Sequence, residues 1–101
     1  LHLSMRLKIM TLNINGLRNL GPLRDFLITQ KPHIVCLQET KILDYQDIPR
    51  FSGYNTFHQE CSLINGNKNY GLITLVATGI AALEGSKYKN NANEMLDVII
   101  P

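Results

Sequence analysis

Two apolar runs on either side of a short amphipathic segment constrain the fold of this chain most strongly. The first run spans residues 6–14 and ends at the turn-forming pair Asn15-Gly16, and the second spans residues 33–37. Runs of this kind are typical of strands buried on both faces of a sheet. Between them, the segment from Pro22 to Gln30 has apolar residues at helical spacing, which predicts a short helix. Strand, helix and strand within about thirty residues predict a βαβ unit with two parallel strands.

The rest of the chain predicts further strands joined by turns. These strands are expected at residues 53–58, near Ser62, at residues 72–78 and at residues 95–100. Residues 44–52 are polar and contain proline, which predicts a loop. The pair Asn65-Gly66 is a strong hairpin signal, expected to join the strand near Ser62 to the run at 72–78. Residues 87–93 are expected to form a polar connection before the last strand.

Composition and charge limit the class of protein. The 101 residues correspond to one small domain or to part of a larger one. The chain is 45% hydrophobic and 18% charged, so it can form a packed core. Its net charge of +2 is a mild basic excess that favours a polyanionic partner without identifying one.

Cysteine usage and hydropathy bear on where the protein works. Cys36 and Cys61 are too few for a disulfide framework, which favours a reducing, intracellular location in the nucleus or cytoplasm. No apolar stretch approaches the roughly 20 residues that span a bilayer, so no membrane partner is expected. Residues 1–5 lack the features of a secretory signal. We expect them to be disordered or foreign to the domain, with Met5 as the natural start.

Polar residues stand where both predicted parallel strands end. Asn13 and Asn15 stand at the exit of the first strand, and Gln38 and Glu39 follow the second. Ligands of open α/β sheets bind outside the carboxyl ends of the strands, so these residues are expected to face one crevice. Carboxylate and amide oxygens suit Mg²⁺, which commonly takes one or two carboxylates from a protein. We expect Glu39 and Asn13 to hold the ion, with Asn15 and Gln38 orienting ligands by amide hydrogen bonds. Turn-forming or solvated side chains are the alternative.

The segments that carry these residues resemble the opening of the endonuclease/exonuclease/phosphatase superfamily. The first segment is residues 8–18, which contains Leu-Asn-Ile-Asn-Gly, and the second is residues 31–41, which contains Gln-Glu-Thr. Within the superfamily the likeness is closest to the endonucleases of LINE-type (non-LTR) retrotransposons, then to the apurinic/apyrimidinic endonucleases. Residues 70–77 look like the family's third block, and the likeness as a whole covers residues 8–80.

The resemblance implies an α+β fold, the N-terminal half of a four-layer α/β sandwich like that of deoxyribonuclease I. Residues 1–101 would then be the N-terminal portion of a single domain. It also implies Mg²⁺ or Mn²⁺ at one sheet edge, with Glu39 as the metal-binding glutamate and Asn13 as the motif asparagine of the active site. Asn15 stands where the apurinic endonucleases commonly have aspartate. Arg18 and Lys41 are candidates for contact with DNA phosphates, and solvated surface cations are the alternative.

The chain departs from the family pattern at several positions. His33 stands where relatives usually have aspartate, and we expect it to be a strand-end residue. Gly79 and Ile80 follow the strand at 72–78, where the family often places arginine or lysine. The family's Asp-x-Asn, a further aspartate and its Ser-Asp-His are not among the 101 residues. No histidine of the chain is preceded by aspartate, so a candidate general base is missing.

Two functions therefore stay open. One is a DNA-nicking, metal-dependent phosphodiesterase whose remaining half lies beyond Pro101. The other is a truncated, inactive remnant that serves as a folding or interaction module. An unrelated nucleotide-binding domain is disfavoured, because no glycine-rich phosphate loop follows the first strand. Four aromatic residues are candidates either for stacking on bases or for closing the core: Tyr45, Phe51, Tyr54 and Phe57.

Overall fold

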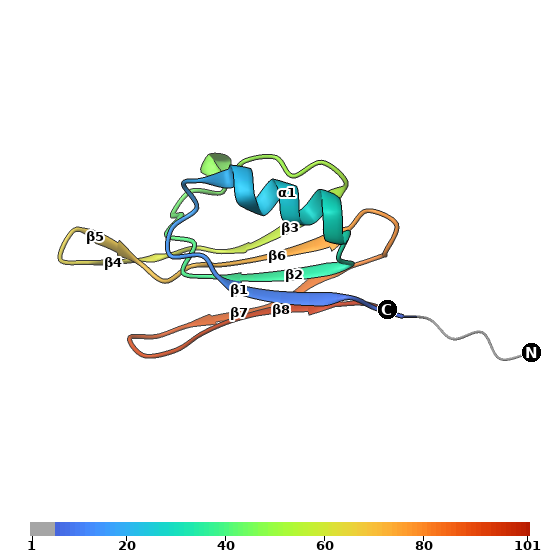
Figure 1. Cartoon of the computed structure of the whole chain (residues 1–101). Helices are drawn as coiled ribbons and strands as arrows, with labels where there is room; N and C mark the ends of the chain where they lie inside the picture. Colours follow the sequence, from blue (N-terminus) through green and yellow to red (C-terminus); the bar gives the residue numbers. More distant parts are fainter. Residues whose placement is uncertain (1–5) are drawn as a thin grey trace, which may run out of the picture.

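The computed structural model describes residues 6–101 and has the predicted α+β fold (Figure 1). Residues 1–5, which we expected to stand apart from the domain, lie outside the described residues. The elements are β1 (Ile9–Asn13), α1 (Leu20–Gln30), β2 (Ile34–Gln38), the 3₁₀ helix η1 (Tyr45–Asp47), β3 (Tyr54–Gln59), β4 (Ser62–Ile64), β5 (Asn67–Asn69), β6 (Leu72–Ala77), β7 (Leu83–Lys89) and β8 (Glu94–Ile99). Among residues 6–101, no helix has the length and apolar character needed to cross a bilayer.

The central sheet has the strand order β1-β2-β6-β3. The strands β1 and β2 are parallel, with Asn13 opposite Gln38, which confirms the predicted βαβ unit. The strand β6 runs antiparallel to both of its neighbours. Helix α1 covers one face of the sheet, and the β7–β8 hairpin lies against the other face, in contact with β3 and β6 (Figure 1). The result is a helix layer, a four-stranded sheet and a second β layer.

Helix α1 starts earlier than the sequence predicts. It begins at Leu20 rather than at Pro22, because proline is tolerated anywhere in the first turn, where the backbone N–H groups lack intrahelical partners. It ends as predicted. Lys31 takes a left-handed conformation with φ of 47°, and its N–H donates to the Leu27 carbonyl at 3.0 Å, just before Pro32.

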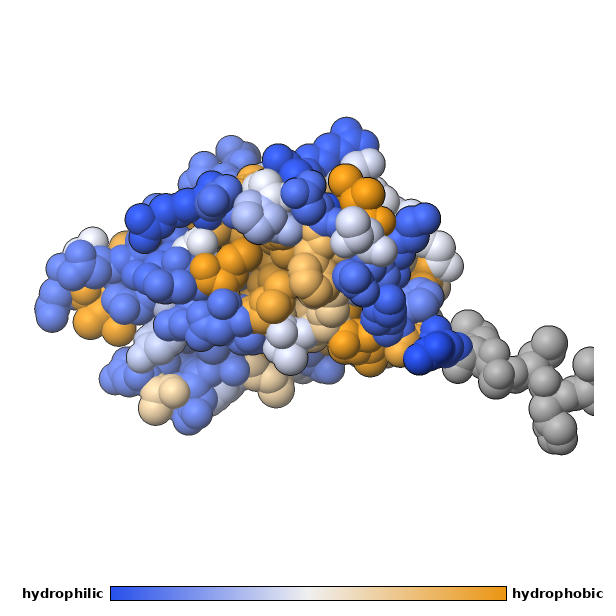
Figure 2. Space-filling view, viewed as in Figure 1, coloured by the Kyte–Doolittle hydropathy of each residue, from blue (hydrophilic) through white to orange (hydrophobic). Residues whose placement is uncertain are grey.

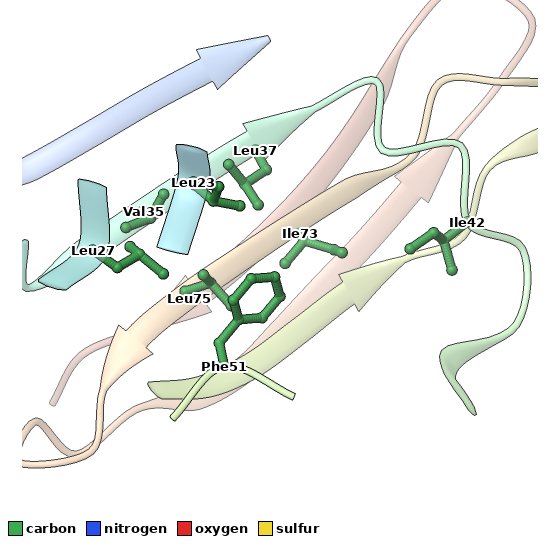
Figure 3. Packing of buried hydrophobic residues seen from close by; sticks show 8 residues of the cluster. All are labelled: Leu23, Leu27, Val35, Leu37, Ile42, Phe51, Ile73 and Leu75. Atoms are coloured by element: carbon green, nitrogen blue, oxygen red, sulfur yellow. The ribbon is translucent and has the colours of Figure 1, made fainter. Parts of the chain in front are cut away.

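The hydrophobic core lies between α1 and the sheet (Figure 3). Its buried side chains are Leu23, Leu27, Val35, Leu37, Ile42, Phe51, Ile73 and Leu75. Each of these large side chains contributes about 1.5–3 kcal/mol by leaving water. Phe51 closes the core from the loop before β3, and the Arg24 guanidinium lies 5.9 Å from the centre of its ring. Of the four aromatic residues considered for base stacking, Phe51 is therefore a core residue.

The prediction that β1 is buried on both faces is wrong. Ile9 is 60% exposed, and exposed and half-buried residues alternate along the strand. The reason is its position, because β1 is an outer strand of the sheet and only the side that bears Met10 and Leu12 packs against the core.

The prediction that the Asn65-Gly66 turn joins the strand near Ser62 to the run at 72–78 is also wrong. The turn joins β4 to β5, whereas β6 pairs with β2 and β3. Asn65 and Gly66 have φ of 52° and 78°, the two positive values that a two-residue hairpin loop of type I′ requires. Tyr70 and Gly71, which also have positive φ, redirect the chain from β5 into β6.

The expected polar connection at residues 87–93 is only partly correct. Leu83–Lys89 forms β7, which pairs with β8, and only the residues after Lys89 make the turn. Asn90 organises that turn, because its Oδ1 accepts the backbone N–H groups of Ala92 and Asn93 at 2.8 and 2.6 Å. Backbone pairing rather than burial makes β7 a strand, since most of its side chains are exposed.

The buried His58 predicts a pH-dependent stability. Its Nε2 lies 3.1 Å from the Ile42 carbonyl oxygen, and burial, the largest cause, lowers its pKa from the usual 6.5. Lys87 also lowers this pKa, whereas the Ile42 hydrogen bond and the charges of Glu60 and Asp44 raise it. A lowered folded-state pKa means that stability is complete above about pH 6.5 and falls as His58 is protonated below that pH.

We therefore expect the melting temperature to be nearly constant above about pH 6.5 and to drop as the pH is lowered further. The variant His58→Gln, which cannot titrate, is expected to lose most of this drop. Thermal melts of the wild type and the variant, followed by circular dichroism, measure the drop. A pH dependence that is the same in His58→Gln and the wild type would contradict the prediction.

Candidate active site

The segments that leave β1 and β2 stay side by side beyond the ends of the strands. The N–H groups of Ile14, Gly16 and Leu17 donate to the carbonyl oxygens of Gln38, Glu39 and Thr40 at 3.0, 2.7 and 3.2 Å, respectively. The parallel pairing thus continues into the two polar segments. This confirms the predicted neighbourhood of the two strand exits, at the edge where ligands of open α/β sheets bind.

Glu39 stands in an unusual backbone conformation. Its φ is 54°, and Lys41 has a φ of 58°, so two residues without the freedom of glycine occupy the left-handed region. Each such residue costs about 1–2 kcal/mol, which the surrounding hydrogen bonds must offset. Besides the Gly16 contact, Thr40 N–H donates to the Gly71 carbonyl at 3.1 Å and Lys41 N–H to the Tyr70 carbonyl at 2.8 Å. Residues 39–41 are therefore held from both sides.

Asn13, the last residue of β1, and Asn15 shape the turn beside Glu39. The Asn13 Oδ1 accepts the Asn15 N–H at 3.2 Å, which stabilises the turn. Asn15 has a φ of 47°, and its own Oδ1 accepts a hydrogen bond from Lys41 Nζ at 2.7 Å. A carbonyl oxygen has two lone pairs, so Asn13 keeps acceptor capacity for a further group.

Gln38 is engaged on the sheet itself. Its Nε2 donates to Thr11 Oγ1 at 2.7 Å and to the Cys36 carbonyl at 3.0 Å. The first of these bonds links β2 to β1 just before the two strands end. Gln38 thus tethers the two strand ends, and its amide is turned back along the sheet.

Two cations flank the turn. Lys41 reaches it through Asn15, and the Arg18 guanidinium folds over Gly16, where an added methyl group would lie 3.2 Å from Arg18 Nε. Gly16 has a φ of 93°, which further favours glycine at this point. The structure therefore brings both predicted phosphate-binding cations to the edge that carries Glu39.

A second carboxylate at this edge escaped the sequence analysis. Glu94 opens β8, and its Oε1 accepts the Gly71 N–H at 3.0 Å. Burial raises the pKa of Glu94, and the negative charge of Glu39 adds to this effect, while the Gly71 hydrogen bond and Lys89 act in the opposite direction. No local pattern signals Glu94, because its position depends on β8 passing beneath the sheet.

The donor set fits a hard divalent cation. A glutamate carboxylate and an amide oxygen are ligands that Mg²⁺ accepts, and the ion usually completes its shell with water or phosphate oxygens. Among residues 6–101 no three His, Cys, Asp or Glu side chains gather around one point. The described residues could therefore supply one part of a metal site that also uses ligands from elsewhere.

His33 lies at the opposite end of β2 from Glu39. Its Nδ1 accepts the Lys8 N–H at 2.9 Å, and its own backbone N–H donates to the Lys8 carbonyl at 2.8 Å. It thus joins the starts of the two parallel strands. This agrees with the expected strand-end role.

An α+β fold with oxygen donors and cations at the carboxyl edge of a parallel strand pair is typical of proteins that bind an anionic ligand at that edge. Similarity to known proteins identifies the family. Residues 10–100 match the model of the Endonuclease/Exonuclease/phosphatase family, so the chain belongs to that family. Members of the family generally use divalent metals. This confirms the superfamily to which the opening motifs pointed.

A solved structure supports the same conclusion. The crystal structure of the Xenopus laevis APE2 catalytic domain is similar, with a TM-score of 0.59 and 33% sequence identity. The match covers 78% of this chain and 27% of that chain, so this chain spans about a quarter of that structure's chain. The match confirms the DNase I-like fold class. No curated protein sequence matches the chain.

Proposed function

We propose that the chain forms the metal-binding part of a DNA-nicking phosphodiesterase of the retrotransposon type. The observation that carries the proposal is the position of Glu39, which is held at the joined exits of β1 and β2 beside the Asn13 turn. In this proposal, Glu39 and Asn13 are the catalytic residues and hold Mg²⁺ or Mn²⁺. The likeness of residues 8–18 to the retrotransposon endonucleases supports the finer assignment.

The neighbouring side chains have roles that follow from their contacts. A bound divalent cation neutralises a phosphodiester and stabilises the charge that builds on the leaving oxygen. Arg18 and Lys41 attract the DNA phosphates on either side of the scissile bond. Asn15 orients Lys41 through the 2.7 Å hydrogen bond, and Gln38 keeps the two strand ends in register through Thr11. Asn15 and Gln38 thus orient the substrate indirectly, Asn15 through Lys41 and Gln38 through its contact with Thr11.

The rest of the domain completes the site in this proposal. The outer edge of β1 is unpaired among the described residues, and a depression of about 280 Å³, lined by apolar residues together with Asn13 and Asn19, lies between β1 and α1. Leu12, Ile14 and Phe26 are among its lining residues, and Figure 2 shows the apolar surface between α1 and β1. A solvated face of this kind is suited to burial. We infer that residues beyond Pro101 cover it and bring the missing ligands and general base to Glu39.

A catalytically inactive remnant or interaction module is the second candidate for the 101 residues alone. The observation that favours it is that residues 6–101 contain no group of three metal-ligating side chains. In either case we infer an intracellular protein of the nucleus or cytoplasm, since both cysteines are free and the proposed substrate is DNA.

Plasmid nicking tests the proposal. We expect the 101-residue chain to leave supercoiled DNA intact, and a protein extended to about twice this length to convert it to open circles. The conversion requires Mg²⁺ or Mn²⁺ and stops when EDTA removes the metal. Metal-independent nicking, or an inactive extended protein, would contradict the phosphodiesterase proposal.

A comparison of two duplex substrates tests the assignment to the retrotransposon type. A duplex with intact bases is compared with the same duplex carrying one abasic site. We expect the intact duplex to be nicked at a comparable rate. A strong preference for the abasic duplex would instead assign the protein to the apurinic type.

A further inference from the structure

A groove of about 730 Å³ runs along the outer side of β3, the edge of the sheet opposite to β1. Its volume lies within the range of ligand sites, about 300–1,000 Å³. Leu43 and Tyr45 form one wall, β3 forms the floor, and Glu84, Lys87 and Tyr88 of β7 form the other wall. The proposed phosphodiesterase function uses none of these residues.

The floor of the groove is a strand edge with free backbone groups. Thr78 N–H donates to the Gly53 carbonyl at 3.0 Å, which fixes the alternation of hydrogen bonds along the antiparallel β3–β6 pair. By that alternation, the N–H and C=O groups of Thr56 and His58 point away from β6, toward the groove. The strand β3 pairs with β6 alone among the described strands. The groove therefore offers a row of backbone donors and acceptors.

The walls differ in chemistry. Leu43 and Tyr45 are 38% and 61% exposed, so the first wall presents apolar and aromatic surface. The second wall is polar, with the Glu84–Lys87 ion pair at 2.8 Å beside Tyr88. An extended segment laid on β3 would direct alternate side chains to the two walls. A segment with apolar residues at every second position and polar residues between them would match the two walls.

The charges of the groove disfavour a nucleic acid. Lys87 forms an ion pair with Glu84, and Lys89 Nζ lies 3.6 Å from Glu60 Oε1. Both lysines at the groove therefore have a carboxylate partner. A groove that follows a phosphate backbone would carry an excess of cations. The balance of charges here favours a ligand recognised through its neutral backbone.

Gln59, a lining residue of the groove, has a buried acceptor without a partner among the described residues. It stands at the end of β3 and is 5% exposed, and the acceptor is its side-chain Oε1. A buried acceptor without a donor is unfavourable. After a small rotation of the Gln59 side-chain amide, a bound segment would donate the hydrogen bond that Oε1 lacks.

We propose that this groove binds an extended peptide segment of a partner protein by strand addition to β3, with apolar side chains facing Leu43 and Tyr45. Main-chain hydrogen bonds would supply most of the affinity, as in other cases of strand addition. A second copy of this chain is disfavoured as the occupant. Its own β3 lies equally deep between two walls, so two such edges cannot meet.

The test uses the blocked octapeptide Lys-Thr-Val-Thr-Tyr-Thr-Val-Lys, labelled with a fluorophore. The variant Thr56→Pro removes a groove-facing N–H and leaves the β3–β6 ladder intact, because proline is tolerated at an edge. Its matched control is Thr56→Ala, which keeps the N–H. We expect fluorescence anisotropy to show binding to the wild type and to Thr56→Ala. The affinity of Thr56→Pro should be about tenfold lower, since loss of one hydrogen bond is worth about that factor.

Amide hydrogen exchange on the wild type keeps the test independent of the folding of Thr56→Pro. Saturating peptide is expected to slow exchange at Thr56 and His58. Failure of the peptide to bind, equal affinity for both variants, or unchanged exchange at these amides would overturn the proposal. Tighter, salt-dependent binding of oligothymidylate at the groove, or dimerisation lost in Thr56→Pro, would also overturn it.

Discussion

Replacing Glu39 by glutamine is expected to lower the rate of metal-dependent nicking by about 10²–10³-fold, the usual loss when one charge-stabilising group is removed. Glutamine has nearly the same shape but no charge, so it binds a divalent cation poorly. The fold should be unaffected, because Glu39 joins the β1 exit through its backbone carbonyl, which still accepts the Gly16 N–H at 2.7 Å. The measurement is the conversion of supercoiled to open-circular plasmid by the extended protein at saturating Mg²⁺.

A carboxylate away from the site provides the matched control. Glu84 lies on β7 in an exposed ion pair with Lys87, so Glu84→Gln removes the same charge from another part of the molecule. We expect this variant to nick like the wild type. Circular dichroism melts establish that both variants are folded. Wild-type rates for Glu39→Gln, or an equal loss in Glu84→Gln, would exclude the assigned role of Glu39.

The part of the fold that local patterns determine was predictable from the sequence. Apolar runs and helical spacing in residues 6–37 predicted β1, α1 and β2, and parallel pairing then placed Asn13 beside the Gln38-Glu39 pair. This step worked because a βαβ unit has one common handedness and a fixed relation between its strand ends. All of the described site except Glu94 therefore lies in or next to a single βαβ unit of about thirty residues.

The parts that depend on distant pairing were not predictable. Leu83–Lys89 lacks apolar alternation and is a strand because β8 pairs with it. The turn at Asn65-Gly66 identified a hairpin but not the strand that follows it. Glu94 reaches the Glu39 edge only because β8 passes beneath the sheet and its carboxylate meets the Gly71 N–H. No spacing within the chain reports such a contact.

Replacing Gly71 by alanine is expected to give the largest loss of stability at the candidate site. Gly71 has a φ of 94°, where an L side chain adds strain of about 1–3 kcal/mol. A methyl group here would also lie 2.6 Å from Thr40 Oγ1 and 3.2 Å from the Lys41 backbone nitrogen. Thr40 is 1% exposed and has no room to withdraw, so overpacking adds about a further 1–3 kcal/mol.

Gly53 separates the two contributions. It has a similar φ of 85°, but nothing lies within 4 Å of a methyl group added there, so Gly53→Ala carries the backbone strain alone. Urea unfolding followed by circular dichroism gives the free energy of unfolding of each variant. We expect Gly71→Ala to lose clearly more than Gly53→Ala, because it must also displace residues 40 and 41, which fix Glu39. Equal losses would mean that the contact between the added methyl group and Thr40 yields without strain.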